Sequence, residues 1–304
     1  MRRHVIATAA VAALALVSPT AASATEGLLL MAHGGSDEWN THVRELAGRL
    51  DRPDRPVEVA LGMASRVTLQ AGIDALTKRG ATEVVAVPLF ISSHSSVIRG
   101  TEYLFGLRDD KPRDLEIFAK MAHGHGAGHE GHGPPADVEA NMRPVDAAVP
   151  IRMAGALDHD AIVADILVDR ARAISTDPAR EAVILVAHGP VPDADNDRWL
   201  ADMKLLAGAM HDAADFASID YLTVRDDAPE PLRGEAAEAL RALVSRRAGE
   251  GRRVLIVPLL LSYGGIEKGI RKRLDGLDYT MAGQGLMPDA RLAAWVERAA
   301  STTP

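Results

Sequence analysis

Two histidines stand at the ends of apolar runs that read as buried strands. His33 follows LLLMA and precedes Gly34 and Gly35, and His94 follows VVAVPLFISS. If the two runs are parallel strands of one sheet, both imidazoles leave it at the same edge, where open α/β sheets bind ligands. Imidazole nitrogens hold divalent transition metals. The pair therefore predicts a metal site, and the alternative is that both histidines serve only the turns, which the serines around His94 could also do.

Four further histidines lie in the segment MAHGHGAGHEGHGPP, residues 121–135. They are spaced by glycine on what we expect to be a loop: His123, His125, His129 and His132. Ordering such a loop around a metal costs conformational entropy that a rigid site does not lose. We expect an accessory loop that binds metal weakly and concentrates it near the site, and the alternative is a linker with no metal role.

The composition excludes several kinds of site. The chain has no cysteine, which excludes thiolate zinc sites, iron–sulfur clusters and a cysteine nucleophile. Any transition metal must therefore bind through histidine, carboxylate or water. The net charge of −8, with no basic block, is unsuited to nucleic acid. The sequence also lacks a phosphate-binding glycine loop and a Gly-x-Ser-x-Gly elbow, which disfavours a nucleotide cofactor and a hydrolase.

The first 24 residues have the pattern of a secretory signal. Arg2 and Arg3 are followed by the apolar run 5–17 and by Ala22-Ser23-Ala24, a small-residue cleavage pattern. The run is too short to cross a bilayer, and we expect no membrane span in the mature chain. The sequence predicts export, with cleavage near Ala24 and a periplasmic or other extracytoplasmic location.

Apolar runs alternate along the rest of the chain with segments whose apolar residues recur at helical spacing. The expected strands are 27–32, 57–61, 84–90, 115–120 and 148–153, then 182–187, 218–223, 254–261 and 278–282. The expected helices are 37–50, 67–78, 162–174, 195–211, 234–247 and 289–300. Strands that are apolar on both faces and separated by helices indicate a parallel, doubly covered sheet, so the fold class is α/β.

Three pairs of segments recur in the same order in the two halves. LLLMAHGG matches ILVAHGP, VVAVPLFIS matches VLIVPLLLS, and PIRMAG matches DYTMAG. We therefore expect two tandem copies of one doubly wound domain, 25–176 and 177–304, with the His-rich loop inserted in the first. His188 repeats His33, but Gly264 stands where the first copy has His94. The second copy is thus expected to wall the cleft, with Glu267 contributing a carboxylate, as a cleft residue or third ligand, or Tyr263 a hydroxyl. The alternative is that each is an ordinary loop residue.

The combination of HGG, an asparagine seven residues after its histidine (Asn40) and PLFISSH resembles the class II tetrapyrrole chelatases. The resemblance is to the sirohydrochlorin cobalt chelatases in their form with two fused copies, and HGP, YLTVRDDAP and PLLLSYGG extend it through the second half. PLFISSH is also similar to the ferrochelatase segment that carries a metal-site histidine.

The resemblance implies a class II metal chelatase, a lyase that inserts Co²⁺, Ni²⁺ or Fe²⁺ as substrate into sirohydrochlorin or a related tetrapyrrole. It implies that His33 and His94 are the catalytic metal ligands and that Asn40 orients His33. Glu102, eight residues after His94, is a candidate third ligand, and the alternative is a solvated carboxylate on the following helix. Many family members have a histidine where this chain has Ser96, so the ligand geometry departs from theirs.

An export signal is unexpected for a biosynthetic chelatase, because its substrate is made in the cytoplasm. The alternative function is an exported carrier or sensor of metal or haem that keeps the chelatase fold without catalysis. A chain with two fused copies can close its own cleft, so we expect a monomer.

Overall fold

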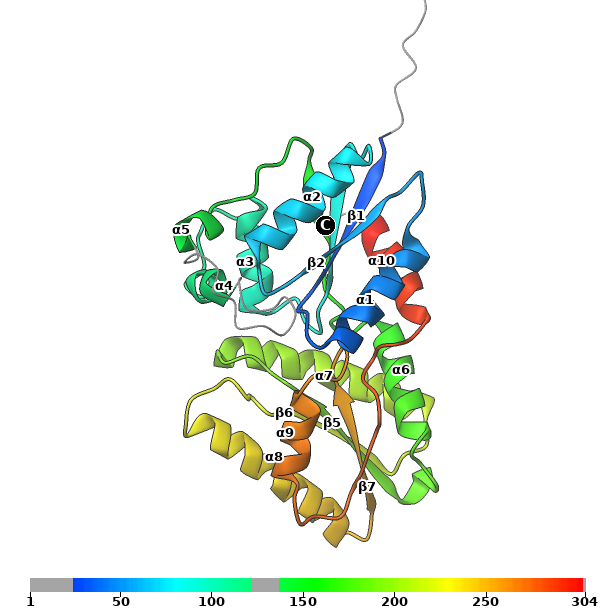
Figure 1. Ribbon diagram of the computed structural model, residues 1–304. Helices are drawn as coiled ribbons and strands as arrows, with labels where there is room; N and C mark the ends of the chain where they lie inside the picture. The colour runs from blue at the N-terminus through cyan, green and yellow to red at the C-terminus, as the bar shows by residue number, and fades with distance from the viewer. Residues whose placement is uncertain (1–23, 122–136, 303–304) are drawn as a thin grey trace, which may run out of the picture.

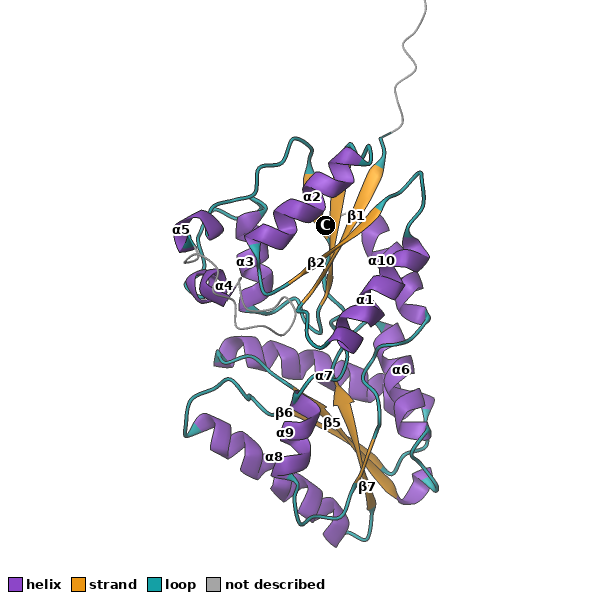
Figure 2. Ribbon diagram, viewed as in Figure 1, coloured by secondary structure: helices purple, strands orange, loops and turns teal. Residues whose placement is uncertain are grey.

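Two four-stranded parallel sheets form the frame of the molecule (Figures 1 and 2). The structure is a computed structural model that describes residues 24–121 and 137–302. Apart from Ala24 and Met121, the predicted signal segment and the His-rich loop lie outside the described residues. The helices within the described ranges include none that is both long and apolar enough to span a membrane.

Both sheets have the same topology, which confirms the predicted tandem α/β copies. The first has the strand order β2-β1-β3-β4 and the second the order β6-β5-β7-β8, with every pair parallel. The strands of the first sheet are β1 (Glu26–Ala32), β2 (Val57–Leu61), β3 (Glu83–Leu89) and β4 (Ile151–Met153). Those of the second are β5 (Glu181–Ala187), β6 (Ser218–Thr223), β7 (Arg253–Leu259) and β8 (Thr280–Met281).

The helices of the first copy are α1 (Asp37–Leu50), α2 (Arg66–Lys78), α3 (Ser96–Leu104), α4 (Leu115–Met121), α5 (Val138–Asn141) and α6 (Ala161–Arg172). After the 3₁₀ turn η1 (Pro178–Arg180), the second copy has α7 (Asp193–Ala213), α8 (Leu232–Gly249), α9 (Ile266–Arg273) and α10 (Arg291–Ser301).

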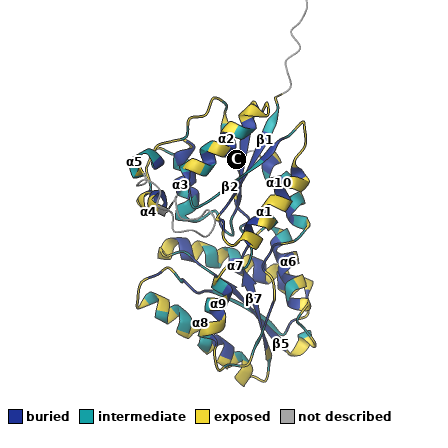
Figure 3. Cartoon of the chain, in the orientation of Figure 1, coloured by how far each residue is buried: buried dark blue, intermediate teal, exposed yellow. Residues whose placement is uncertain are grey.

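Side chains of the central strands enter a different core on each face of the sheet. Leu28 and Leu30 of β1 join a core with residues of α1, whereas Leu29 and Met31 join a second core with residues of α2. A strand with both faces covered needs apolar residues at successive positions, which explains the continuous apolar runs of the sequence. Figure 3 shows these strands buried and the outward sides of the helices exposed.

The prediction of a strand at 115–120 was wrong, because this segment is helix α4. Leu115, Phe118 and Ala119 are buried, whereas Ile117 between them is 56% exposed. That burial pattern has helical spacing, and it would not fit a strand with alternate residues on one face. Glu116 and Lys120 form an ion pair of 2.7 Å one helical turn apart. The His-rich loop therefore follows a helix.

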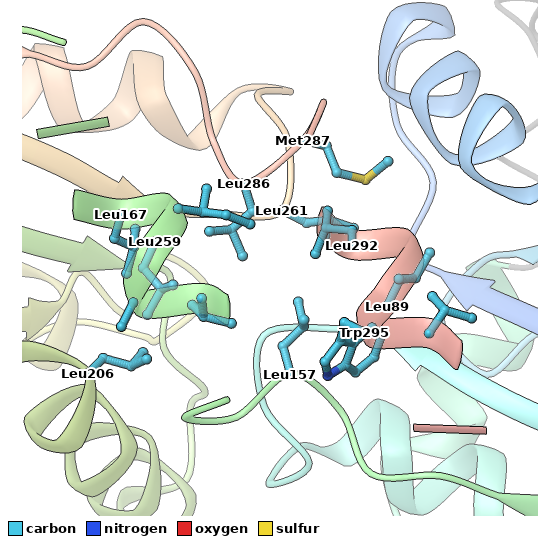
Figure 4. Packing of buried hydrophobic residues seen from close by; sticks show 14 of the residues in the cluster. Leu89, Leu157, Leu167, Leu206, Leu259, Leu261, Leu286, Met287, Leu292 and Trp295 are labelled. Carbon is cyan, nitrogen blue, oxygen red and sulfur yellow. The ribbon is translucent and has the colours of Figure 1, made fainter. Parts of the chain in front are cut away.

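The last helix of each copy packs on the sheet of the other copy. α6 lies against α7 and β7 of the second copy, and α10 lies against β3 and α1 of the first (Figure 1). Figure 4 shows Leu292 and Trp295 of α10 near Leu89 at the end of β3. One continuous apolar core therefore includes residues of both copies and ties them together.

An ion-pair network fixes α10 to the first sheet. Glu297 of α10 pairs with Arg55 and, at 3.1 Å, with Arg52. Arg152 of β4 donates to the carboxylate of Glu26 at 2.7 Å and to the carbonyl of Ala300 at 2.5 Å.

Candidate functional site

The two predicted metal ligands flank the point where the order of strands reverses. From β1 the chain moves to β2 on one side and later to β3 on the other, which makes the gap between β1 and β3 the topological switch point. Ala32 and Leu89 pair in register. His33 follows the first of them directly and His94 comes five residues after the second. Both therefore emerge at one edge of the sheet, as the sequence predicted.

Asn40 positions the turn that carries His33. The Asn40 side chain accepts a hydrogen bond from the backbone N–H of Gly35 at 2.9 Å and donates one to its carbonyl at 3.1 Å. Gly34 in this turn has a φ of +81°, which a glycine adopts without strain. His33 itself is exposed, and its Nδ1 lies 2.7 Å from the carbonyl oxygen of Gly34. A donating Nδ1 leaves the lone pair on Nε2, the form in which imidazole binds a metal.

Asp158 holds the loop that carries His94. Its carboxylate accepts from the backbone N–H of Ser93 at 2.6 Å and from the Ser93 hydroxyl at 2.7 Å. The Ser92 hydroxyl accepts from the backbone N–H of His94 at 3.1 Å. Asp158 follows β4 and has a φ of 45°, a backbone conformation that is uncommon for a residue with a side chain.

The second copy also contacts the His94 loop, through helix α7. The indole N–H of Trp199 donates to the carbonyl of His94 at 2.8 Å, and Nη1 of Arg198 lies 3.4 Å from Nδ1 of His94. Arg99 forms a two-bond ion pair with Asp195, at 3.0 and 2.7 Å. The predicted metal site therefore lies where the two copies meet.

Comparisons with known proteins bear on the family and on the fold. Residues 27–174 match the model of the CbiX family. The matched residues make up nearly half of the chain, and with the structural matches below they support a class II chelatase family. The search of curated proteins found no match.

Solved structures extend the likeness over both copies. SirB from Bacillus subtilis with Fe³⁺ is 17% identical with a TM-score of 0.57, and the match covers 90% of this chain and 94% of that one. The sirohydrochlorin chelatase SirB from Bacillus subtilis subspecies spizizenii in complex with cobalt is 16% identical, with coverages of 91% and 96% and a TM-score of 0.54. CbiX, the terminal enzyme for biosynthesis of siroheme in denitrifying bacteria, is 15% identical, with coverages of 91% and 100% and a TM-score of 0.52. The chain thus shares the two-domain chelatase fold.

The two candidate carboxylates each have a partner. In the first copy, Glu102 accepts from Arg108 at 3.2 Å. Glu267 lies in the other half, 7% exposed, and accepts from the backbone N–H groups of Gly264 and Gly265 at 3.1 and 2.8 Å. Within residues 24–121 and 137–302, no group of three or more histidines and carboxylates is arranged to hold a metal. A role for either glutamate as third ligand stays a prediction.

The second copy has a different arrangement at the equivalent edge. The Nε2 atom of His188 lies 3.4 Å from a carboxylate oxygen of Asp227. Gly264 lies close to Trp39 of the first copy, since a Cβ atom added to this glycine would be 3.7 Å from the Trp39 side chain. The Tyr263 hydroxyl donates to the carbonyl of Ala282 at 2.5 Å, and burial raises the pKa of Tyr263 to about 12. Tyr263 is therefore a neutral hydrogen-bond donor at neutral pH.

Proposed function

We propose that the protein inserts a divalent metal, Co²⁺, Ni²⁺ or Fe²⁺, into sirohydrochlorin or a related tetrapyrrole, with His33 and His94 as the metal ligands. The observation that carries this proposal is the position of these two histidines at the switch point of a CbiX-family domain. Both belong to the half of the chain that matches the family, and each is held by its own hydrogen-bonded turn.

The chemistry needs a metal holder and a proton acceptor in one place. Entry of M²⁺ into the macrocycle displaces two pyrrole protons, and histidine can accept a proton near neutral pH. As the metal passes to the pyrrole nitrogens, each imidazole that releases it can accept one of the two displaced protons. The protein's main contribution is then positioning, since the reaction needs no nucleotide and no redox step.

The two histidine ligands do not determine which metal the site binds. Imidazole nitrogens suit Co²⁺, Ni²⁺ and Fe²⁺ alike, so the two ligands do not select among them. One of the two similar SirB structures contains Fe³⁺ and the other cobalt. We propose that the His-rich loop supplies metal to the site rather than shaping it, because glycine-spaced ligands lose entropy on ordering.

We further propose that residues 1–24 direct export and that the protein acts outside the cytoplasm. Together with the four loop histidines, this signal favours a second candidate, an exported protein that carries or senses metal or haem on a chelatase fold. The two candidates differ in one measurable property, which is the rate of metal insertion.

The test uses the chain from Thr25 with sirohydrochlorin and each metal, and it follows the absorbance change on insertion. We expect acceleration over the uncatalysed rate, loss of it in His33→Ala and in His94→Ala, and little change in the second-copy control His188→Ala. A variant with glutamine at the four loop histidines should keep insertion at saturating metal. If no metal is inserted faster than in buffer, and metal binding disappears with the loop histidines, the carrier candidate replaces the chelatase.

A further inference from the structure

One side of helix α7 faces the His94 loop of the other copy. Asp195, Arg198 and Trp199 are spaced i, i+3 and i+4, which places them on the same side of a helix. All three contact residues 94–99 of the first copy, at the end of the loop and the start of α3. One turn further along, Asp202 accepts from Nδ1 of His159 at 2.7 Å. This side of α7 is therefore a polar docking face for the copy that carries the metal-site histidines.

Trp199 acts on the peptide unit of His94. An indole has a single N–H donor, and here it is used on the His94 carbonyl at 2.8 Å. The Trp199 ring packs against the apolar core that the two copies share. A donor fixed by such packing holds the peptide of His94 in one orientation, and this fixes the backbone from which the imidazole projects.

The Arg99–Asp195 pair fixes the other end of the same contact. Asp195 is only 7% exposed, and a buried carboxylate bonded by both arms of a guanidinium has one favoured geometry. Asp195 comes seven residues after His188, as Asn40 comes seven after His33. In the first copy the residue at this position, Asn40, hydrogen-bonds to the turn of its own copy. In the second copy the equivalent Asp195 pairs with Arg99 on α3 of the other copy.

We propose that α7 of the second copy positions His94 for metal insertion, with Trp199 orienting its backbone and the Asp195–Arg99 pair holding α7 in place. The inference rests on the proposed function, because it takes His94 as a metal ligand. The second copy, which has glycine where the first has His94, then contributes to the site as the support of the first copy's ligand.

The test compares Trp199→Phe with Lys204→Ala, an exposed position on the opposite side of α7. Both are made in a background with glutamine at His123, His125, His129 and His132, so that the loop does not bind the probe. Co²⁺ binding is followed by its visible absorption, and insertion into sirohydrochlorin by steady-state kinetics. Phenylalanine keeps most of the ring but loses the donor. We expect Co²⁺ affinity and kcat to fall about three- to tenfold, the effect of one hydrogen bond, with KM for the tetrapyrrole changed less than about twofold. Lys204→Ala should match its parent.

A second set keeps the inference testable if Trp199→Phe folds poorly. The set is a double-mutant cycle made of Arg99→Gln, Asp195→Asn and the variant with both changes. If the two side chains act through each other, the double variant should lose no more Co²⁺ affinity than the worse single variant. Additive losses, or a Trp199→Phe variant that binds Co²⁺ and turns over like its parent, would overturn the positioning role and leave the proposed function intact. If the parent protein neither binds Co²⁺ through His33 and His94 nor inserts it, both the positioning role and the proposed function are wrong.

Discussion

Asn40 is the residue on which the position of His33 most directly depends. Its amide satisfies both the N–H and the carbonyl of Gly35, and it is 8% exposed. Asn40→Ala removes both hydrogen bonds, each of which typically contributes about 0.5–1.5 kcal/mol, so we expect the free energy of unfolding to fall by about 1–3 kcal/mol. The insertion rate should fall as well, because the turn that carries His33 is released. Urea unfolding followed by circular dichroism measures the first effect.

Asn40→Asp is the matched control, since it keeps the acceptor for the Gly35 N–H but cannot donate to the Gly35 carbonyl. Its stability should lie between those of the wild type and Asn40→Ala. An alanine variant that unfolds at the wild-type urea concentration, with an unchanged rate, would mean that the Asn40 contacts do not hold the turn.

The sequence revealed the two histidines but not the residues that hold them in place. His33 and His94 are visible because each ends an apolar run, which is a local pattern. Asp158, Asp195 and Trp199 act across 65, 96 and 105 residues of chain, and no spacing in a single sequence links them to their partners. Asn40 was predicted to orient His33, and its hydrogen bonds go to Gly35, two residues further along the same turn.

At the scale of elements, Glu181 joins the connection between the copies to the second sheet. This residue of β5 is 1% exposed and accepts hydrogen bonds from Ser175, from Thr176 and from Arg253 of β7. Burial alone would raise the pKa of Glu181, but the hydrogen bonds outweigh it and lower the pKa to about 2. The connection is therefore held by a carboxylate that stays ionised down to acid pH.

The folded-state pKa of Glu181 lies below the value of 4.5 expected in the unfolded chain. Its stabilisation is thus present above about pH 5 and is lost as the pH falls toward 2, by an amount on the order of 3 kcal/mol. We expect Glu181→Gln to be less stable at pH 7 and to lose this part of the acid dependence. Urea unfolding at several pH values between 7 and 2 measures it, with the exposed Glu238→Gln as control. Parallel pH profiles for wild type and Glu181→Gln would contradict the prediction.

The elements themselves were predicted best where the apolar pattern is long. Helix α1 has the predicted bounds, and β1, β2, β3, β5 and β6 differ from prediction by at most one residue at either end. The predicted strand 148–153 shrinks to the three residues of β4, which pairs only with β3 at the sheet edge. The helix α9 was not expected, because only Glu267 and Ile270 of it are buried and its apolar face is too narrow to show in the sequence.

At the scale of the whole molecule, the exchange of α6 and α10 gives the two copies a shared core. Local spacing shows that each helix has an apolar side, but it does not show which sheet that side covers. The predicted boundary at 176/177 divides the sequence repeats, and it stays a prediction. The packing crosses it in both directions, since α6 precedes the boundary and covers the second sheet, while α10 follows it and covers the first.

This exchange predicts that the copies do not fold separately. A fragment of residues 25–176 would lack α10, whose Leu292, Trp295 and Val296 are at most 3% exposed, and would expose the apolar side of α6. Each large apolar side chain removed from the core costs about 1.5–3 kcal/mol, so the loss of one helix approaches the whole stability of a domain. We expect each half alone to be unfolded or aggregated, and the two halves mixed during refolding to form a one-to-one complex that unfolds cooperatively. Circular dichroism and size-exclusion chromatography test both expectations.

A chain truncated after residue 290 tests the loss of α10 alone, because it has no break between the two copies. It keeps both sheets and the connection between them but lacks α10, so we expect its first copy to unfold at lower urea concentration than in the full-length chain. If the 25–176 fragment folds alone with the stability that it has in the intact chain, the shared core is not what holds the copies together. The docking face of α7 would then be the contact that joins them, and the Asp195→Asn variant should weaken association of the mixed halves.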